Sequence, residues 1–402
     1  HSISRTQIDQ DALKIMRRLI RFGHKGYLVG GGVRDLLLGK EPKDFDIATD
    51  ATPRKIKSLF RNCRIIGKRF KLAHVYFRGM KIIEVATFRK QTTDDSDDPE
   101  TETVTLGKDN TFGDEQNDAL RRDLTINGLF YDLDTFTVID YVGGVEDLRN
   151  GIVRMIGDPM TRYTEDPVRM LRVARHAGRT GFTIEAATGA AIEKCLPLLA
   201  DVAPVRIYEE VKKDMTSGHF REIAALFDSL GLLSTLLPRW SDLEVKPWDR
   251  HSPFYPDIEE LDCSFQEHET DQVNLTLSAL CVWYARIKFE QEFFSHVIEQ
   301  KDDVPAFVNE VFEGLLVPRK EKERIQDILR ALQVFEQKGP NAIQGQHIRS
   351  KANVQSLVAL LQVLNHPEFD DEARNILNNL SIKRKKRGRP QKRFMRKPGG
   401  NF

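Results

Sequence analysis

Hydrophobic residues in the first ninety positions alternate between the spacing of helices and the spacing of strands. Apolar side chains at intervals of three and four predict helices over residues 6–22, 33–38 and 53–60. Short apolar or alternating runs predict strands over residues 27–29, 45–48, 64–66, 73–77 and 82–87. A turn around Gly79 joins the last two strands into a hairpin, in which Glu84 faces away from Ile83 and Val85. The pattern therefore predicts a mixed sheet with helices on one side, an α+β arrangement.

Beyond residue 115 the hydrophobic spacing is helical almost throughout. One hairpin is expected over 130–132 and 137–141, and helices are expected over 166–179, 186–231 and 271–380. Residues 91–110 are acidic and predict a flexible loop, while 241–270 are polar, contain three prolines and predict a loop-like junction. We therefore expect an α+β head over 1–150, a helical neck over 151–240, a helical body over 241–381 and a disordered basic tail over 382–402.

The composition of the 402 residues, 40% hydrophobic and 30% charged, is that of a soluble globular chain. No apolar run approaches the ~20 residues that span a bilayer, which argues against a membrane protein. The four cysteines are scattered and form no Cys-x-x-Cys pair, so we expect reduced thiols in a cytoplasmic protein and no structural zinc. The sequence begins at His1 and not at methionine, so a preceding leader cannot be read from it.

The net charge of +1 hides a strong asymmetry. Residues 383–397 hold ten Lys or Arg and no acid, and removing ten from 61 leaves 51 basic against 60 acidic residues, about −9. Such a tail on an acidic protein is a candidate clamp for the phosphate backbone of RNA. A solubilising tail, a nuclear-import-like segment and a minor-groove hook are the alternatives. The predicted RNA contacts are Lys383, Arg384, Lys385, Lys386, Arg387, Arg389, Lys392 and Arg393.

Two features that lie close together in the sequence indicate phosphoryl transfer. Gly30-Gly31-Gly32 forms a turn after a buried strand, where backbone N–H groups can approach an anion closely. Asp44 and Asp46 follow, and carboxylates at i and i+2 on an extended segment point to the same side. Such carboxylates bind Mg²⁺, and the glycine turn suits a triphosphate. Each feature alone is common, but the two in this order are specific.

Residues 121–127 form a second cluster, Arg-Arg-Asp-Leu-Thr-Ile-Asn. In a helix, Asp123 and Asn127 would share one face at i and i+4. They could then address a ribose or a metal while Arg121 and Arg122 reach phosphates. Taken by itself, such a triplet of charges is more often a solvated helix end.

A third cluster begins at Glu165 and Asp166. The expected helix carries arginines on one arc and hydrophobic residues on the other. A row of arginines on a half-buried helix is usually a solvated face. With two acids at its start, it could also bind a base edge, because arginine donates to ring nitrogens and a carboxylate accepts from an exocyclic amine. The arginines are Arg169, Arg172, Arg175 and Arg179.

As a set and in this order, these residues resemble the class II nucleotidyltransferases of the polymerase-β superfamily, which comprise tRNA CCA-adding enzymes and bacterial poly(A) polymerases. The resemblance covers about residues 1–185 and rests on residues 28–39, 44–46, 121–127 and 165–169. Gly32 and residues 42–46, 60–64, 72–75 and 163–170 look more like poly(A) polymerases than CCA-adding enzymes. Leu124 and Gly128 depart from the usual pattern, but neither carries chemistry.

The resemblance implies a polymerase-β-like head and template-independent addition of AMP from ATP to RNA 3′ ends, which promotes RNA decay. Asp44 and Asp46 would bind two Mg²⁺ ions, one activating the RNA 3′-hydroxyl and one neutralising the triphosphate. Asp123 is the third acid of the family's pattern, and Glu84 is a rival on geometry alone. The implied nucleotide-binding residues are Gly30, Gly31, Arg34, Asp35, Asn127, Asp166, Arg169 and Arg172.

Two other functions stay open from the sequence. A CCA-adding enzyme would use the same chemistry, accept CTP as well as ATP, and stop once CCA is complete. A catalytically inactive RNA-binding protein is disfavoured because Asp44, Asp46 and Asp123 are all present. Protein partners, such as RNA-chaperone or RNA-decay proteins, cannot be read from the sequence.

Overall fold

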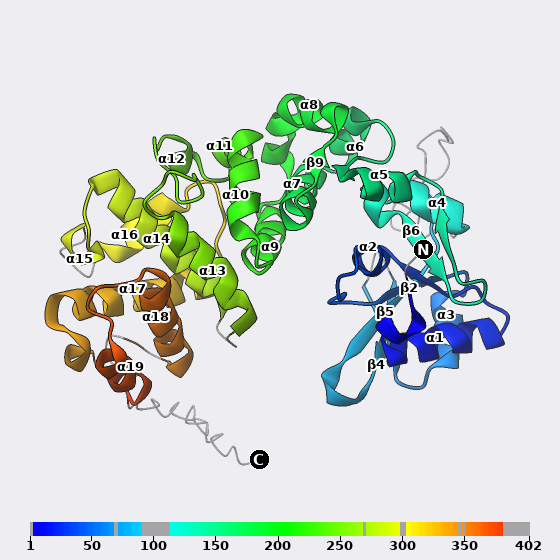
Figure 1. Cartoon of the computed structure of the whole chain (residues 1–402), viewed down its shortest axis with the longest axis horizontal. Helices are drawn as coiled ribbons and strands as arrows, with labels where there is room; N and C mark the ends of the chain where they lie inside the picture. Colours follow the sequence, from blue (N-terminus) through cyan, green and yellow to red (C-terminus); the bar gives the residue numbers. More distant parts are fainter. Residues whose placement is uncertain are drawn as a thin grey trace, which may run out of the picture. The chain divides into compact units, whose positions relative to one another are not determined.

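The computed structural model describes residues 3–67, 71–90, 113–267, 271–297, 303–343, 348 and 350–380. Contacts divide the chain into two compact units, each described here by itself (Figure 1). The first unit contains residues 1–242, 248–250 and 313–316, and the second contains the rest. The predicted acidic loop and basic tail lie outside the described residues, and the four-part division of the chain stays a prediction.

A seven-stranded mixed sheet forms the N-terminal part of the first unit, as predicted. Its strands lie in the order β3-β4-β5-β2-β1-β6-β7. All neighbours are antiparallel except β2 and β5, which run parallel. The strands are β1 (Tyr27–Val29), β2 (Asp46–Thr49), β3 (Cys63–Ile66), β4 (Leu72–Tyr76), β5 (Ile82–Thr87), β6 (Leu129–Asp132) and β7 (Thr137–Asp140). A separate small sheet pairs β8 (Ile152–Val153) with β9 (Thr183–Ile184).

Short helices flank this sheet. They are α1 (Gln10–Arg21), α2 (Gly31–Leu37), α3 (Pro53–Leu59), α4 (Glu115–Leu120) and α5 (Gly144–Asn150). The predicted helix over 6–22 starts later, because the Asp9 side chain caps α1 by accepting from the N–H groups of Asp11 and Ala12. Helix α1 packs on β2, and α3 packs on β3, β4 and β5. Glu84 is exposed between the buried Ile83 and Val85, as the alternation predicts.

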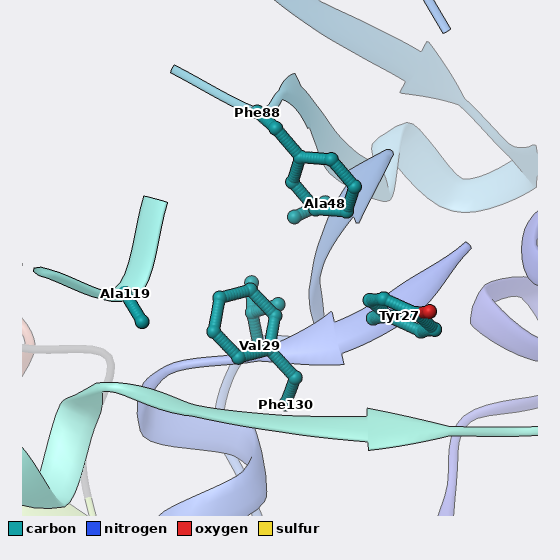
Figure 2. Packing of buried hydrophobic residues seen from close by; sticks show 6 residues of the cluster. All are labelled: Tyr27, Val29, Ala48, Phe88, Ala119 and Phe130. Atoms are coloured by element: carbon teal, nitrogen blue, oxygen red, sulfur yellow. The ribbon is translucent and has the colours of Figure 1, made fainter. Parts of the chain in front are cut away.

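An aromatic cluster covers part of the other face of the sheet (Figure 2). The rings of Tyr27, Phe88 and Phe130 lie 5.9 to 6.3 Å apart and pack with Val29, Ala48 and Ala119. Ala119 belongs to α4, so the cluster fixes α4 over β1, β2 and β6. Strand register places Asp46 and Phe130 on either side of Val29, so Asp46 lies on the same face as the cluster.

Helices fill the remainder of the first unit, as predicted. They are α6 (Pro159–Glu165), α7 (Arg169–Thr180), α8 (Ala186–Cys195), α9 (Pro204–Met215), α10 (Phe220–Ser229), α11 (Leu232–Leu236) and α12 (Pro238–Ser241). The prediction that one helix runs over 166–179 is wrong at its start. Asp166 and Pro167 lie between α6 and α7, because a residue that precedes proline avoids helical backbone angles.

The second unit is helical and is built around α14 (Gln272–Phe289), which is buried continuously from Gln272 to Ala285. The other helices are α13 (Tyr255–Glu267), α15 (Phe294–Val297), α16 (Val304–Val311), α17 (Arg319–Lys338), α18 (Lys351–Val363) and α19 (Asp371–Asn378). The prediction of a loop-like 241–270 is wrong where α13 forms. Pro256 lies in the first turn of α13, where its missing N–H costs nothing. Within the described ranges, no helix is long and apolar enough to cross a membrane.

A close crossing of α7 and α10 gives a test of this packing. A Cβ at Gly178 would lie 2.7 Å from Ile223 Cγ1 and 3.0 Å from the Ile223 backbone nitrogen. Gly178→Ala should therefore lower the free energy of unfolding by about 1–3 kcal/mol, because the backbones must separate. Gly189→Ala on α8 is the matched control, since its Cβ would meet only Ile184 at 3.6 Å. It should be neutral or stabilising by up to ~1 kcal/mol. If urea unfolding showed that both substitutions change the free energy of unfolding equally, this result would contradict the close crossing of α7 and α10.

Candidate active site

Asp46 is the first residue of β2, in the middle of the sheet, and Asp44 precedes the strand by two residues. The predicted strand began at residue 45, so the structure starts it one residue later. On one side Asp46 is paired with Val29 of β1. On the other side the register of β2 and β5, Ile47 with Val85, brings Glu84 next to Asp46. Asp44, Asp46 and Glu84 are all accessible to solvent.

Negative charge accumulates at Asp46. Desolvation by the surrounding protein is the largest cause that raises the pKa of Asp46 to about 6, and the Glu84 and Asp44 carboxylates add to the shift. Arg122 opposes it without cancelling it. A divalent cation would remove this repulsion, and Mg²⁺ is commonly bound by one or two carboxylates together with substrate phosphates. Among the described residues, no three His, Cys, Asp or Glu side chains converge closely enough to hold an ion by themselves.

The glycine turn lies beside these carboxylates. Gly30 adopts φ +67°, and a Cβ there would lie 3.1 Å from Arg122 Nη1. A Cβ at Gly32 would lie 3.3 Å from the Asp44 carbonyl oxygen, so the third glycine lets the backbone at Asp44 come close. Gly31 opens α2. The turn therefore lies against the Arg122 side chain and the Asp44 backbone.

Arg34 is buried and binds other predicted site residues. Its Nε and Nη2 donate to Asp35 Oδ1 at 2.9 and 2.7 Å, and its Nη1 donates to Asn127 Oδ1 at 2.8 Å. His176 Nδ1 lies 3.1 Å from the same Nη1. Burial and the Arg34 guanidinium lower the pKa of His176 to about 3, so the ring is neutral. Arg34 thus contacts both Asp35 and Asn127, and the role of these residues in nucleotide binding stays a prediction.

Asp123 lies with the arginines of α7. The prediction that Asp123 and Asn127 share a helical face is wrong, because Asn127 ends a short 3₁₀ turn (Thr125–Asn127) that Asp123 precedes. The two still lie close together, since the Asn127 side chain contributes to lowering the pKa of Asp123. Arg172 Nη1 lies 3.5 Å from Asp123 Oδ2, and the Leu124 N–H donates to Oδ1 at 2.8 Å. Burial opposes ionisation, but these groups keep the pKa of Asp123 below its usual value.

The arginine row on α7 is not a solvated face. Arg175 is buried and donates to Glu210 Oε2 at 2.7 Å and to Asp214. Arg172 Nη2 donates to Glu210 Oε1 at 3.1 Å, so Glu210 joins both arginines. Burial raises the pKa of Glu210, but the two guanidinium groups outweigh it and hold that pKa at about 2. Burial raises the pKa of Asp214 to about 7. The solvated-face interpretation is therefore wrong for Arg175.

Asp166 and Arg169 lie at the start of α7. Arg206 Nη2 donates to Asp166 Oδ2 at 2.7 Å, while Asp166 Oδ1 is buried without a hydrogen-bond partner. Arg169 Nη1 donates to Glu165 Oε2 and to the Arg162 carbonyl oxygen, both at 2.8 Å. One acceptor at Asp166 is therefore available to a ligand. The predicted RNA contacts of the tail lie outside the described residues.

Sequence reasoning missed His176, Glu210 and Arg206. His176 follows Arg169 by seven residues and Arg172 by four on α7, so helical spacing could have found it. Glu210 and Arg206 belong to α9, 35 to 40 residues from their partners, and no local pattern indicates them.

Known proteins share both the sequence and the fold. A family model described as the poly A polymerase head domain matches residues 26–154. A second, described as a probable RNA- and SrmB-binding site of polymerase A, matches residues 181–243. Poly(A) polymerase I of Salmonella typhi is 36% identical over 99% of this chain and 92% of its own length. That of Escherichia coli O6:H1 strain CFT073 is 41% identical over 82% of this chain and 72% of its own.

CCA-adding enzymes are more distant. The enzyme of Bacillus pumilus is 39% identical over 53% of this chain and 51% of its own. The solved structure of the Bacillus stearothermophilus CCA-adding enzyme in complex with CTP aligns with a TM-score of 0.62 at 24% identity, over 92% of this chain and 80% of that one. At this identity the likeness shows the fold alone, and it confirms the polymerase-β-like head predicted from the sequence.

The Glu210 network generates a prediction about pH. The free pKa of a glutamate is 4.5 and Glu210 is held at about 2, so its pairing contributes about 3 kcal/mol above pH 4.5. This contribution is lost as the pH falls through about 2. Urea unfolding should show Glu210→Gln less stable than wild type at pH 7, with the difference shrinking towards pH 2. Its exposed neighbour provides the control, Glu209→Gln, which should change stability by less than about 0.5 kcal/mol. A difference between Glu210→Gln and wild type that does not depend on pH would contradict the assignment.

Proposed function

The chain belongs to the poly(A) polymerase I family and is a nucleotidyltransferase, and we propose that Asp44, Asp46 and Glu84 form its reaction centre. Its reaction is template-independent addition of AMP from ATP to the 3′ ends of RNA. The observation that supports this centre best is the strand register, which places Glu84 beside Asp46 and pairs Asp46 with Val29, the residue before the left-handed glycine turn. The RNA 3′-oxygen attacks the α-phosphorus of ATP, and pyrophosphate leaves on the opposite side.

Two carboxylates and the glycine turn suit a metal-bound triphosphate. Asp44 and Asp46 would hold two Mg²⁺ ions, which when bound lower the pKa of the RNA 3′-hydroxyl and neutralise the triphosphate and the departing pyrophosphate. The backbone of Gly30 and Gly31 and the Arg122 guanidinium would bind the phosphates, since Arg122 lies against the turn at Gly30.

The sequence leaves two candidates for the third acid, Glu84 and Asp123, and the geometry favours one of them. Glu84 is adjacent to Asp46 across β2 and β5, and its charge acts on Asp46. Asp123 instead contacts Arg172 and Asn127. We therefore assign the third acidic position to Glu84 and give Asp123 the role of holding Arg172. In this arrangement Arg34, Asp35 and His176 orient Asn127 beneath the nucleotide.

The start of α7 suits a purine base. Asp166 Oδ1 is a buried acceptor without a partner, and an adenine 6-amino group is a matching donor. Arg169 and Arg172 lie one and two turns away along the chain and can donate to ring nitrogens. CCA addition is the alternative, and the CCA-adding relative from Bacillus pumilus matches only 53% of the chain. A cytoplasmic location and RNA binding by residues 383–397 remain proposals drawn from the sequence.

The carboxylates give the first test. Asp44→Asn or Asp46→Asn should reduce nucleotide addition at least ~100-fold, because an amide is a poor ligand for Mg²⁺. The melting temperature of Asp46→Asn without Mg²⁺ should equal or exceed that of wild type, since the raised pKa shows that the charged carboxylate is unfavourable in the fold. Asp134→Asn, in the exposed turn before β7, is the charge-matched control. Near-normal turnover by the double variant Asp44→Asn/Asp46→Asn would eliminate this reaction centre.

Asp166 gives a test of base recognition. Asp166→Asn keeps an acceptor for Arg206 and replaces the unpaired acceptor by an N–H donor. We expect kcat/KM for ATP to fall at least ~10-fold and the relative use of UTP and GTP to rise, because their O4 and O6 atoms accept hydrogen bonds. Arg149→Gln, an exposed change on α5, should leave kcat/KM for ATP and the relative use of UTP and GTP unchanged. A uniform loss with every nucleotide would show that Asp166 supports the fold and does not contact the base.

A further inference from the structure

A row of polar side chains crosses the sheet from the reaction centre to its edge. Register places Glu84 opposite His74 and His74 opposite Arg64, on strands β5, β4 and β3. Directly opposite residues point to the same face, so Asp46, Glu84, His74 and Arg64 form one row. His74 Nε2 lies 3.2 Å from Glu84 Oε1. Strands are ~4.8 Å apart, so the row is about 14 Å long.

A cavity of about 430 Å³ lies at the far end of this row. Its volume is in the range of small-ligand sites, and its lining is polar, basic and aromatic. The Arg64 guanidinium stands 5.6 Å from the centroid of the Tyr76 ring. We name it the β3–β4 pocket, and it is lined by Arg61, Asn62, Cys63, Arg64 and Tyr76.

The surroundings of the β3–β4 pocket are basic and offer apolar surface. Arg61 and Arg64 line the pocket, and its lining contains no Asp or Glu. Ile66 and Ile82 on the same face are 43% and 44% exposed. Cationic side chains with an aromatic ring and apolar surface are the combination by which proteins bind single-stranded nucleic acid.

The chemistry fixes from which side the acceptor must approach. Attacking and leaving oxygens lie in line, on opposite sides of the α-phosphorus. The triphosphate is assigned to the glycine turn after β1, on one side of β2. The RNA 3′ end must then come from the other side of β2, where β5, β4 and β3 follow. On the β1 side, the aromatic cluster and α4 already cover this face.

We propose that the β3–β4 pocket binds the RNA acceptor strand a few nucleotides before its 3′ end. A base stacks on Tyr76, Arg64 and Arg61 contact the phosphates, and the strand follows the row to Asp46. At ~3.4 Å per stacked nucleotide, 14 Å corresponds to about four nucleotides. The inference rests on the proposed function, because that function supplies the RNA and the direction of attack.

Direct binding tests the pocket separately from turnover. The probe is a fluorescent oligoadenylate of about 12 nucleotides ending in a 3′-deoxy residue, titrated into the full chain without ATP. Arg64→Gln/Tyr76→Ala should raise its Kd at least ~5-fold, and the log–log salt slope should become less steep by about 0.7 for each lost phosphate contact. Tyr76→Phe keeps the ring and should bind nearly as well as wild type. Arg17→Gln, an exposed arginine of α1, should not change the Kd.

A length series adds a second readout. With extendable primers, the double variant should raise KM for the 12-nucleotide primer and leave KM for a dinucleotide primer and for ATP within about twofold, because a dinucleotide cannot reach the pocket. A double variant that binds the oligoadenylate with the same Kd as the wild type would overturn the proposal. If the double variant raised KM for ATP and left the Kd for RNA unchanged, the proposal would also be overturned, because the pocket would then bind ATP and not RNA. Wild-type protein that binds RNA but never extends it would refute the proposed function alone, since the binding comparison still decides the pocket.

Discussion

The placement of Asp46 at the start of the central strand β2, partly desolvated and beside a second carboxylate, is the constraint on which the account of the head depends. Asp46 lies in the centre of a seven-stranded sheet, with Glu84 beside it and Asp44 two residues away. The Arg122 guanidinium opposes the effect of these charges on Asp46 without cancelling it. A fold selected for stability alone would pair or remove such charges. Their presence close to a left-handed glycine turn is explained if a cation and a triphosphate complete the site.

Helix α7 connects base recognition to the packing of the first unit. Its first turns carry Arg169 and Arg172, while Arg175 one turn later is buried against Glu210 and Asp214. The same arginine spacing therefore joins the start of α7 to the buried anchor at Arg175, and the proposed base contacts lie at that start. Gly178 then lets α10 approach closely. The position of the side chains proposed to bind the base thus depends on packing contacts further along α7.

The parts of the site that sequence predicted are those encoded locally. A glycine turn, two acids at i and i+2, and alternating strands need only neighbouring residues, and the sheet and its hairpins follow from them. Sequence could not indicate that Glu210 joins Arg172 to Arg175, because α9 returns to α7 only through tertiary packing. The prediction of a loop over 241–270 relied on its prolines and was wrong at α13, because proline is tolerated in the first turn of a helix, where Pro256 lies. Asp123 and Asn127 did meet, but through a 3₁₀ turn and not a helix.

The central claim is that this centre transfers adenylate to RNA, and the identity and number of the nucleotides added test it most directly. The measurement is incubation of the wild-type chain with Mg²⁺, end-labelled oligoadenylate and each of the four nucleoside triphosphates separately, with product length read on a denaturing gel. A parallel reaction uses a tRNA that lacks its CCA end. The account predicts long, heterogeneous products with ATP and little extension with CTP. Efficient CTP incorporation with products that stop when CCA is complete would contradict it. A chain that extends neither RNA with any of the four nucleotides would also contradict it.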